Sequence, residues 1–311
     1  MLVEFRVANF RSIHEEQVLS FVASNDKTAE ETHLMDAGIK GVSQLVRTAV
    51  IYGPNASGKS SVLNALDYLR QVVTQSATVI QPGATYNVQP FRLNAESATQ
   101  PTHLEMTFVM DGVRHQYGFT ITPERIVDEW LLVYRTAKPQ RWFQRKWNAK
   151  TQTHDYELGT HLTGARKLWQ DSTRANALFL STAAQLNSEQ LGAVFQWIVQ
   201  SANYFAAGLS PAPDYTTGLL KTDEGRHKVR EFMAAADTGI VDVQAVTRKG
   251  FRQTIEFNAA AGGVAQVVRE EGEVFVPMFK HSADPLMPSF ELQEESHGTQ
   301  RLYALAAPVI N

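Results

Sequence analysis

A glycine-rich run early in the chain limits the folds open to it: Gly53-Pro54-Asn55-Ala56-Ser57-Gly58-Lys59-Ser60. It matches the pattern G-x-x-x-x-G-K-[ST], in which glycines allow a tight turn whose successive N–H groups bind phosphate oxygens. In this pattern the lysine, Lys59, contacts the β- and γ-phosphates, and the hydroxyl of Ser60 binds Mg²⁺. The run predicts a phosphate loop (P-loop) that binds ATP or GTP with magnesium.

The residues on either side of the P-loop fit this interpretation. A short apolar run at 48–52 precedes it, as a buried parallel strand would. A helix is expected directly after it, because apolar residues recur at helical spacing at Val62, Leu66, Leu69 and Val73. A chance match in a glycine-rich turn would lack this strand-to-helix context.

An antiparallel β block is expected next. Residues 104–110 and 113–121 alternate between apolar and polar side chains on either side of Asp111-Gly112, which is a strong hairpin signal. Two more strands are expected at Ile126–Tyr134 and Arg141–Trp147. The block therefore follows the P-loop helix as an insertion.

The other expected elements are an opening strand, a buried strand at Ala177–Leu180 and several helices and strands in the last third of the chain. The opening strand covers residues 2–7. Helices are expected around 191–199, at Asp223–Ala236, and from Ser296 onward with Leu302, Leu305, Ala306 and Val309 on one face; strands are expected at Ile240–Val246, Thr254–Phe257 and Glu273–Phe279.

Composition excludes several kinds of site. There is no cysteine, so disulfides, thiolate catalysis and Cys-ligated zinc or iron–sulfur centres are ruled out. The formal net charge of −3 gives no support for a nucleic-acid partner. The first residues lack the features of a signal peptide, and no stretch approaches the roughly 20 apolar residues that cross a bilayer. We expect a soluble, cytoplasmic protein without a membrane partner.

The residues between the fixed positions of the P-loop pattern indicate which class of P-loop protein the chain resembles. The run Tyr52–Ser61 resembles the phosphate loop of the RecF, SMC and OLD branch of ABC-type ATPases, where G-x-N-x-[SA]-G-K-S is common. The opening run Phe5–Ser12 is similar to the first strand of that group and its N-F-[RK]-[SC] turn. The resemblance implies that Arg11 and Ser12 lie near the bound nucleotide, together with residues 53–61. The alternative is an ordinary strand and turn.

The run Glu295–Leu302 is similar to the ABC signature, S-x-G-x-x. The resemblance implies that Ser296 and Gly298 contact the γ-phosphate held by a second copy, so that a homodimer sandwiches two ATP molecules. The alternative is a simple helix N-cap. Gln185 is similar to the glutamine that senses Mg²⁺ and the attacking water in this group, and so joins Lys59 as a catalytic candidate. An exposed glutamine at a helix start is an equal alternative.

The resemblance covers nearly the whole chain and is closest to the RloA-like AAA-family ATP-binding proteins. It implies an α/β fold of the P-loop NTPase, ABC-ATPase head type: a central, mostly parallel sheet with an inserted antiparallel β block and a helical lobe. The ATP-binding lobe is expected at residues 1–175 and the signature lobe at 176–311. An effector encoded nearby and a role in anti-phage defence are also implied. The runs that carry it are Val22–Ser24, Tyr52–Ser60, Pro90–Leu93, Asn176–Ser181 and Glu295–Thr299.

An ABC-type ATPase also needs a Walker B strand that ends in Asp-Glu. Asp128-Glu129 follows only two apolar residues inside the antiparallel block, and Asp242 lacks the glutamate. Both precede the signature, so neither is the expected magnesium acid. Since the sequence ends at Asn311, we expect a truncated or split ATPase that hydrolyses ATP slowly.

Basic and aromatic residues interleave between 135 and 147, which can indicate nucleic-acid binding. An exposed hairpin with its aromatic residues packed inward is the favoured interpretation, because the whole-chain charge gives no support for the other. Three functions remain open: an ATPase that dimerises on ATP and controls an effector, a nucleotide sensor that never turns over, and a DNA-repair ATPase of the RecF kind.

Overall fold

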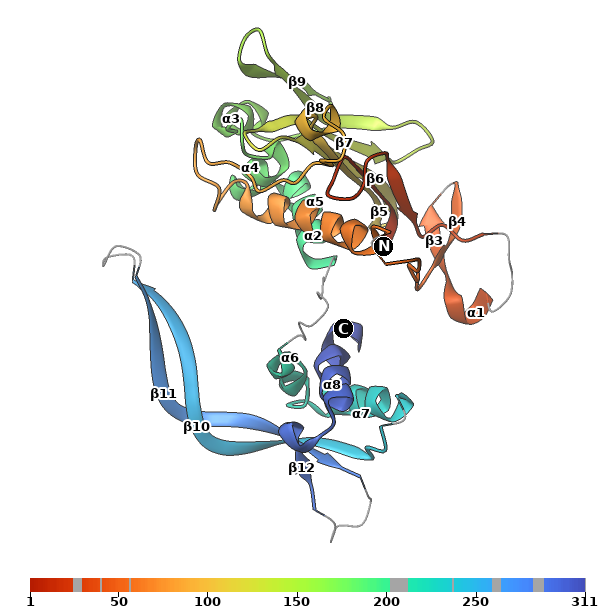
Figure 1. Ribbon diagram of the computed structural model, residues 1–311, viewed down its shortest axis with the longest axis vertical. Helices are drawn as coiled ribbons and strands as arrows, with labels where there is room; N and C mark the ends of the chain where they lie inside the picture. The colour runs from red at the N-terminus through yellow and green to blue at the C-terminus, as the bar shows by residue number, and fades with distance from the viewer. Residues whose placement is uncertain are drawn as a thin grey trace. The chain divides into compact units, whose positions relative to one another are not determined.

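The computed structural model describes residues 1–24, 30–39, 41–55, 57–201, 212–236, 238–258, 264–281 and 288–310. By its internal contacts the chain divides into two units, Met1–Tyr204 and Phe205–Asn311, both drawn in Figure 1. The sequence interpretation divided the lobes at 175–176 instead. The difference arises because two helices after residue 175 pack against the P-loop helix of the first unit.

The first unit contains fourteen α-helices and β-strands among the described residues, and a 3₁₀ helix at Ser97–Thr99. In chain order they are β1 (Leu2–Ala8), β2 (Gln17–Ser20), α1 (Glu30–His33), β3 (Leu34–Ile39), β4 (Val42–Val46), α2 (Lys59–Gln75), β5 (Thr102–Met110), β6 (Val113–Ile121), β7 (Ile126–Tyr134), β8 (Gln140–Asn148), β9 (Thr153–Leu158), α3 (Arg166–Ser172), α4 (Phe179–Gln185) and α5 (Glu189–Ser201).

A sheet of seven described strands dominates this unit, in the order β2-β1-β5-β6-β7-β8-β9. Every pairing in it is antiparallel, so the expected central, mostly parallel sheet is wrong for the described residues. Strands β5 to β9 follow one another through short turns, and a parallel pair needs a crossover of a dozen or more residues. The expected hairpin is confirmed: Asp111 and Gly112, with φ of 51° and 69°, close a two-residue turn between Met110 and Val113.

The strand expected at 48–52 is not formed, which is a second correction. These residues are irregular, and Val50 and Tyr52 are 78% and 90% exposed. A strand exists only when a neighbour pairs with it, and no described strand pairs with this segment. The P-loop therefore lies at a junction between irregular chain and helix.

Helices α2, α4 and α5 pack together beside the sheet and form the main core with it (Figure 1). The helix expected after the P-loop is confirmed as α2, whose Leu69 and Val73 are fully buried. On α5, Leu191, Val194 and Ile198 are likewise buried at helical spacing. The sheet contributes large apolar side chains to the same cluster, among them Phe5, Leu104, Phe119, Leu131 and Phe143.

The strand expected at Ala177–Leu180 is wrong. Residue 178 is the N-cap of α4, and Phe179 is its first helical residue. A short apolar run fits a buried strand and a buried helix equally well, so periodicity alone does not separate them. Here the carboxylate of Glu129 accepts hydrogen bonds from the amides of Phe179 and Leu180, which favours a helix start.

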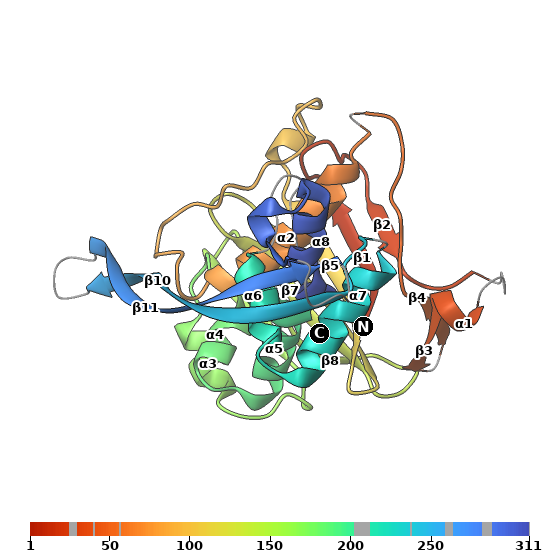
Figure 2. The same cartoon turned by 90° about the horizontal axis from the view of Figure 1, so that it is seen from below.

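The second unit contains α6 (Pro213–Leu219), α7 (Asp223–Ala235), β10 (Asp242–Asn258), β11 (Val264–Lys280), β12 (Phe290–Glu291) and α8 (His297–Ile310). Strands β10 and β11 pair antiparallel along their whole length, so the three strand pieces expected here belong to one long hairpin. In both views this hairpin extends beyond α6, α7 and α8 (Figures 1 and 2).

Helix α7 confirms the helix expected from Asp223, and its Val229 and Met233 are buried. Helix α8 confirms the last expected helix, and its buried face agrees in part with the expected one. Ala306 is fully buried and Leu302 packs against the core, as expected, whereas Val309 is 63% exposed and Tyr303 is buried instead. No described helix of either unit has the length and apolar character to cross a membrane.

Candidate nucleotide-binding site

The P-loop leads directly into α2, which begins at Lys59. Gly58, the residue before it, has a φ of 91°, a left-handed conformation that favours glycine. No side chain caps this helix end. Because first-turn amides have no acceptor within the helix and the helix dipole is positive there, an uncapped N-terminus favours an anion.

The side chain of Lys59 folds back over the loop. Its Nζ donates hydrogen bonds to the carbonyls of Gly53 at 2.9 Å and Pro54 at 2.7 Å. An ammonium carries three N–H groups, so one remains for a phosphate oxygen. Ser60 is exposed in the first turn of α2.

Of the other predicted P-loop residues, Asn55 and Ser57 are exposed and Ser57 closes the loop by donating its amide to the Pro54 carbonyl at 3.3 Å. Ala56 lies outside the described residues. The segment thus presents polar groups and main-chain amides rather than an apolar surface. This chemistry fits a triphosphate.

The turn at residues 9–12 meets the P-loop helix through Ser12. Its Oγ lies 2.7 Å from the Oγ of Ser61, and a Cβ added to Gly58 would stand 3.3 Å from it. Arg11 is exposed beside it, with φ of 51° and its guanidinium 5.5 Å from the ring centre of Phe10. The structure therefore brings Ser12 to the P-loop, although the two are almost 50 residues apart in sequence.

Gln185 lies elsewhere in the first unit. It is the exposed last residue of α4, so the expected place just after a strand is wrong. Helix α4 contacts α2 near its C-terminal end, where the Ser181 hydroxyl donates to the Val73 carbonyl at 2.6 Å. That point is about 21 Å along α2 from Lys59. Within the described chain, no hydrogen bond joins Gln185 to the P-loop.

The signature candidates belong to the second unit. Ser296 caps α8, since its Oγ accepts the amide of Thr299 at 3.1 Å. Gly298 is exposed in the first turn, and a Cβ there would meet only the Ser296 hydroxyl, at 3.7 Å. The N-cap geometry is therefore present, and it leaves both residues open to solvent.

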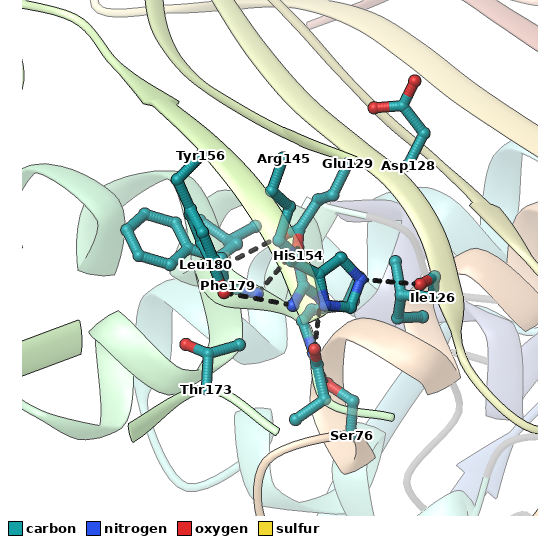
Figure 3. A network of polar contacts seen from close by, with 12 residues as sticks. Ser76, Ile126, Asp128, Glu129, Arg145, His154, Tyr156, Thr173, Phe179 and Leu180 are labelled. Carbon is teal, nitrogen blue, oxygen red and sulfur yellow. Dashed lines mark hydrogen bonds and ion pairs between the residues drawn. The ribbon is translucent and has the colours of Figure 1, made fainter. Parts of the chain in front are cut away.

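The Asp-Glu pair on β7 faces in two directions (Figure 3). Glu129 is fully buried, and its Oε2 accepts from Arg145 Nε at 2.8 Å and from the Phe179 amide at 2.7 Å. Asp128 lies on the other face of the strand and pairs with Lys146 at 3.6 Å. Neither carboxylate has a polar contact with the described residues of the P-loop, which agrees with rejecting both as the magnesium acid.

The buried Glu129–Arg145 pair has further partners. Tyr117 donates to Glu129 Oε1 at 3.1 Å, as does the amide of Leu180 at 3.0 Å. Arg145 also donates to the carbonyl of Ala177. Each charge is thus paired and hydrogen-bonded, as burial requires. The network fixes the start of α4 to the middle of the sheet.

His154 on β9 lies beside this network, and its Nε2 is 2.8 Å from the Ile126 carbonyl. Burial, helped by the Arg145 guanidinium, lowers the pKa of His154 to about 4. Between pH 6.5 and 4 the unfolded chain binds a proton that the folded chain does not, so stability should fall as pH drops through this window. Urea unfolding at pH 7 and pH 4.5 measures the fall.

The variant His154→Gln keeps a donor for the Ile126 carbonyl and removes the titrating ring. Its loss of stability between pH 7 and 4.5 should be smaller than that of the unmodified chain. Burial also lowers the pKa values of His103 and His115, so part of the fall should persist. An identical fall in variant and parent would contradict the assignment to His154.

The basic and aromatic residues around 135–147 follow the packed-hairpin interpretation. Phe143 and Arg145 are fully buried and Trp142 is 4% exposed. Of the exposed cations in this range, Arg141 pairs with Glu157 and Lys146 with Asp128. Arg141 and Lys146 are thus engaged within the fold, whereas Arg135 and Lys138 are exposed.

One comparison bears on the P-loop. The family model described as "AAA domain, putative AbiEii toxin, Type IV TA system" matches residues 49–167, which hold the P-loop, α2 and strands β5 to β9. The match indicates a P-loop ATPase domain of the AAA type. No curated protein matches the chain. The described residues of the chain contain no group of three or more His, Asp or Glu side chains that could hold a metal by themselves, so a magnesium ion would need phosphate and water oxygens as well.

The sequence does not predict the contacts of two polar residues of the first unit: it places Asn9 in the opening turn, and it offers Glu129 only as a candidate magnesium acid. Asn9 has a φ of 52°, a conformation that asparagine tolerates better than most residues, so its place in a tight turn carried a weak signal. Glu129 carried none, because its partners Phe179 and Leu180 lie about 50 residues away. Both act through contacts that are remote in sequence.

Proposed function

We propose that this chain binds ATP with magnesium at residues 53–61 and hydrolyses it. The observation that carries the proposal is the uncapped N-terminus of α2, with Gly58 left-handed and Lys59 poised over the loop. Lys59 would bind the β- and γ-phosphates, and Ser60 would hold the magnesium ion. Ser12, in contact with Ser61, would line the same site.

In this proposal two copies in the cytoplasm close around ATP, and the change controls a partner effector in bacterial anti-phage defence, as the RloA-like resemblance implies. Ser296 and Gly298 of one copy would face the nucleotide held by the other. Their exposure at the N-terminus of α8 supports this role. The family description, which names a putative AbiEii toxin and a type IV TA system, supports the defence setting.

Calorimetric titration with Mg-ATP tests the binding step, and light scattering with and without Mg-ATP tests the dimer. We expect heat of binding at one site per chain and a doubling of mass in ATP. Well-folded protein that releases no heat and binds no labelled ATP would overturn the proposal.

A nucleotide sensor without turnover is the second candidate. It is favoured by the placement of the Asp-Glu pair, because Glu129 is enclosed by Arg145 and α4, and Asp128 is paired with Lys146. A steady-state phosphate-release assay separates the two candidates. Release above the level of a Lys59→Ala variant supports the ATPase, whereas binding without release supports the sensor.

A further inference from the structure

Asn9 is a buried amide whose side chain uses both of its N–H donors and accepts one hydrogen bond. It is 7% exposed, and its Nδ2 donates to the carbonyls of Ser97 and Gln100, each at 2.8 Å. Its Oδ1 accepts the amide of Phe91 at 3.0 Å. One side chain thus holds two separate points of segment 89–101, which contains a 3₁₀ helix at Ser97–Thr99 and lies more than 80 residues further along the chain.

The backbone of Asn9 starts the tight turn that carries Ser12. Its amide donates to the His14 carbonyl at 3.1 Å, and Phe10 and Ile13 exchange hydrogen bonds at 2.9 and 2.8 Å. Thr102 donates its hydroxyl to the Asn9 carbonyl at 2.7 Å. The Thr102 bond ties the turn to the start of β5.

The same turn also meets the P-loop and the start of α2. Ser12 contacts Ser61 at 2.7 Å and occupies the space that a side chain at Gly58 would need. The turn is therefore held between segment 89–101 and the first turn of α2, and Asn9 provides most of the side-chain contacts to that segment. A substitution of Asn9 should therefore change the positions of Ser12 and Gly58, although Asn9 itself is buried away from the loop.

We propose that Asn9 is a positioning residue of the nucleotide site, which holds the Ser12 turn against the P-loop. The inference rests on the proposed function, since it assigns Asn9 a role in binding Mg-ATP. It also has a structural content of its own, the anchoring of residues 9–14. Both parts are open to measurement.

The structure offers a matched control at Asn176. This asparagine is 4% exposed and lies in the same unit, and its Nδ2 likewise donates to two carbonyls, those of Gln81 at 2.8 Å and Ala84 at 3.0 Å. Its partners follow the C-terminal end of α2, whereas the P-loop lies at the other end. Asn9→Asp and Asn176→Asp therefore remove the same donors in similar surroundings.

The experiment measures the Kd for Mg-ATP of three variants at a temperature where all are folded. Asn9→Gly joins the two aspartate variants because it removes the side chain without adding charge and suits the left-handed φ of 52°. Both Asn9 variants should raise the Kd by about tenfold or more, since small displacements of positioned groups cost large factors. Asn176→Asp should leave the Kd within about twofold.

Hydrogen exchange without nucleotide gives the second readout. The amides of Phe10 and Ile13 should lose protection in Asn9→Gly and keep it in Asn176→Asp. Unchanged protection and Kd in the Asn9 variants, or an equal rise in Kd for Asn176→Asp, would overturn the inference. If the unmodified chain fails to bind Mg-ATP, the proposed function falls, and retained protection in Asn9→Gly would then refute the anchoring as well.

Discussion

Glu129→Ala should lower the free energy of unfolding of the first unit by about 3–5 kcal/mol, the usual cost of removing one partner from a buried ion pair. The variant leaves the fully buried Arg145 guanidinium without its counter-charge. It also leaves the amides of Phe179 and Leu180 without acceptors at the start of α4. Each buried donor left unsatisfied adds to the cost.

Tryptophan fluorescence during urea unfolding measures this loss selectively. All five tryptophans lie between residues 130 and 197, so their signal reports on the first unit alone. The neighbouring Asp128→Ala is the matched control, because the same strand carries this half-buried carboxylate at 3.6 Å from the largely exposed Lys146. Such a pair contributes about 1 kcal/mol or less.

A double-mutant cycle with Arg145→Ala isolates the pair itself. The double variant should be more stable than the sum of the two single losses predicts, because it leaves no uncompensated charge. A Glu129→Ala loss no larger than that of Asp128→Ala would contradict the assigned role of the network. So would full additivity in the cycle.

The β block of this fold could be predicted because the alternation of apolar and polar residues, which has a period of two, is visible within each strand. Residues 102–110 and 113–121 alternate on either side of Asp111-Gly112, whose left-handed residues close the turn. The apolar runs 48–52 and 177–180 carry no such local information. The run 48–52 would need a neighbouring strand to pair with, and the described residues contain none that does. The run 177–180 leads into a helix, whose first amide is bonded by the distant Glu129.

The residues of the candidate site likewise divide into those that a local pattern predicts and those that it does not. Gly58 and Lys59 are recognised from sequence because loop and helix are adjacent and the pattern is local. Only the family resemblance predicted that Ser12 lies near the P-loop, because its contact with Ser61 joins residues almost 50 positions apart in the sequence. Asn9 and Glu129 bond partners that are still further away in the sequence. A lone polar residue in a strand or turn gives no sign of such contacts in the sequence.

Lys59→Ala should raise the Kd for Mg-ATP by about 100-fold or more. A hydrogen bond to a charged group contributes about 1.5–3 kcal/mol, and the one N–H of Lys59 that remains free would make such a bond with a phosphate oxygen, in addition to the charge attraction between the ammonium and both phosphates. The lysine also covers the carbonyl oxygens of Gly53 and Pro54, which would otherwise lie uncompensated near the phosphate oxygens. Calorimetry gives the affinity, and the ATP-induced rise in Tm gives an independent estimate.

Without nucleotide, Lys59→Ala should unfold close to the parent Tm, because the two carbonyls it uncovers belong to exposed residues that water can solvate. Lys150→Ala controls for the loss of one positive charge, since Lys150 is exposed in the turn between β8 and β9. It should change neither the Kd nor the ATP-induced rise in Tm. Because a helix N-terminus alone also attracts anions, ATP binding by Lys59→Ala within about threefold of the parent would mean that the ammonium adds little to what the uncapped α2 provides. That result would remove Lys59 from the site.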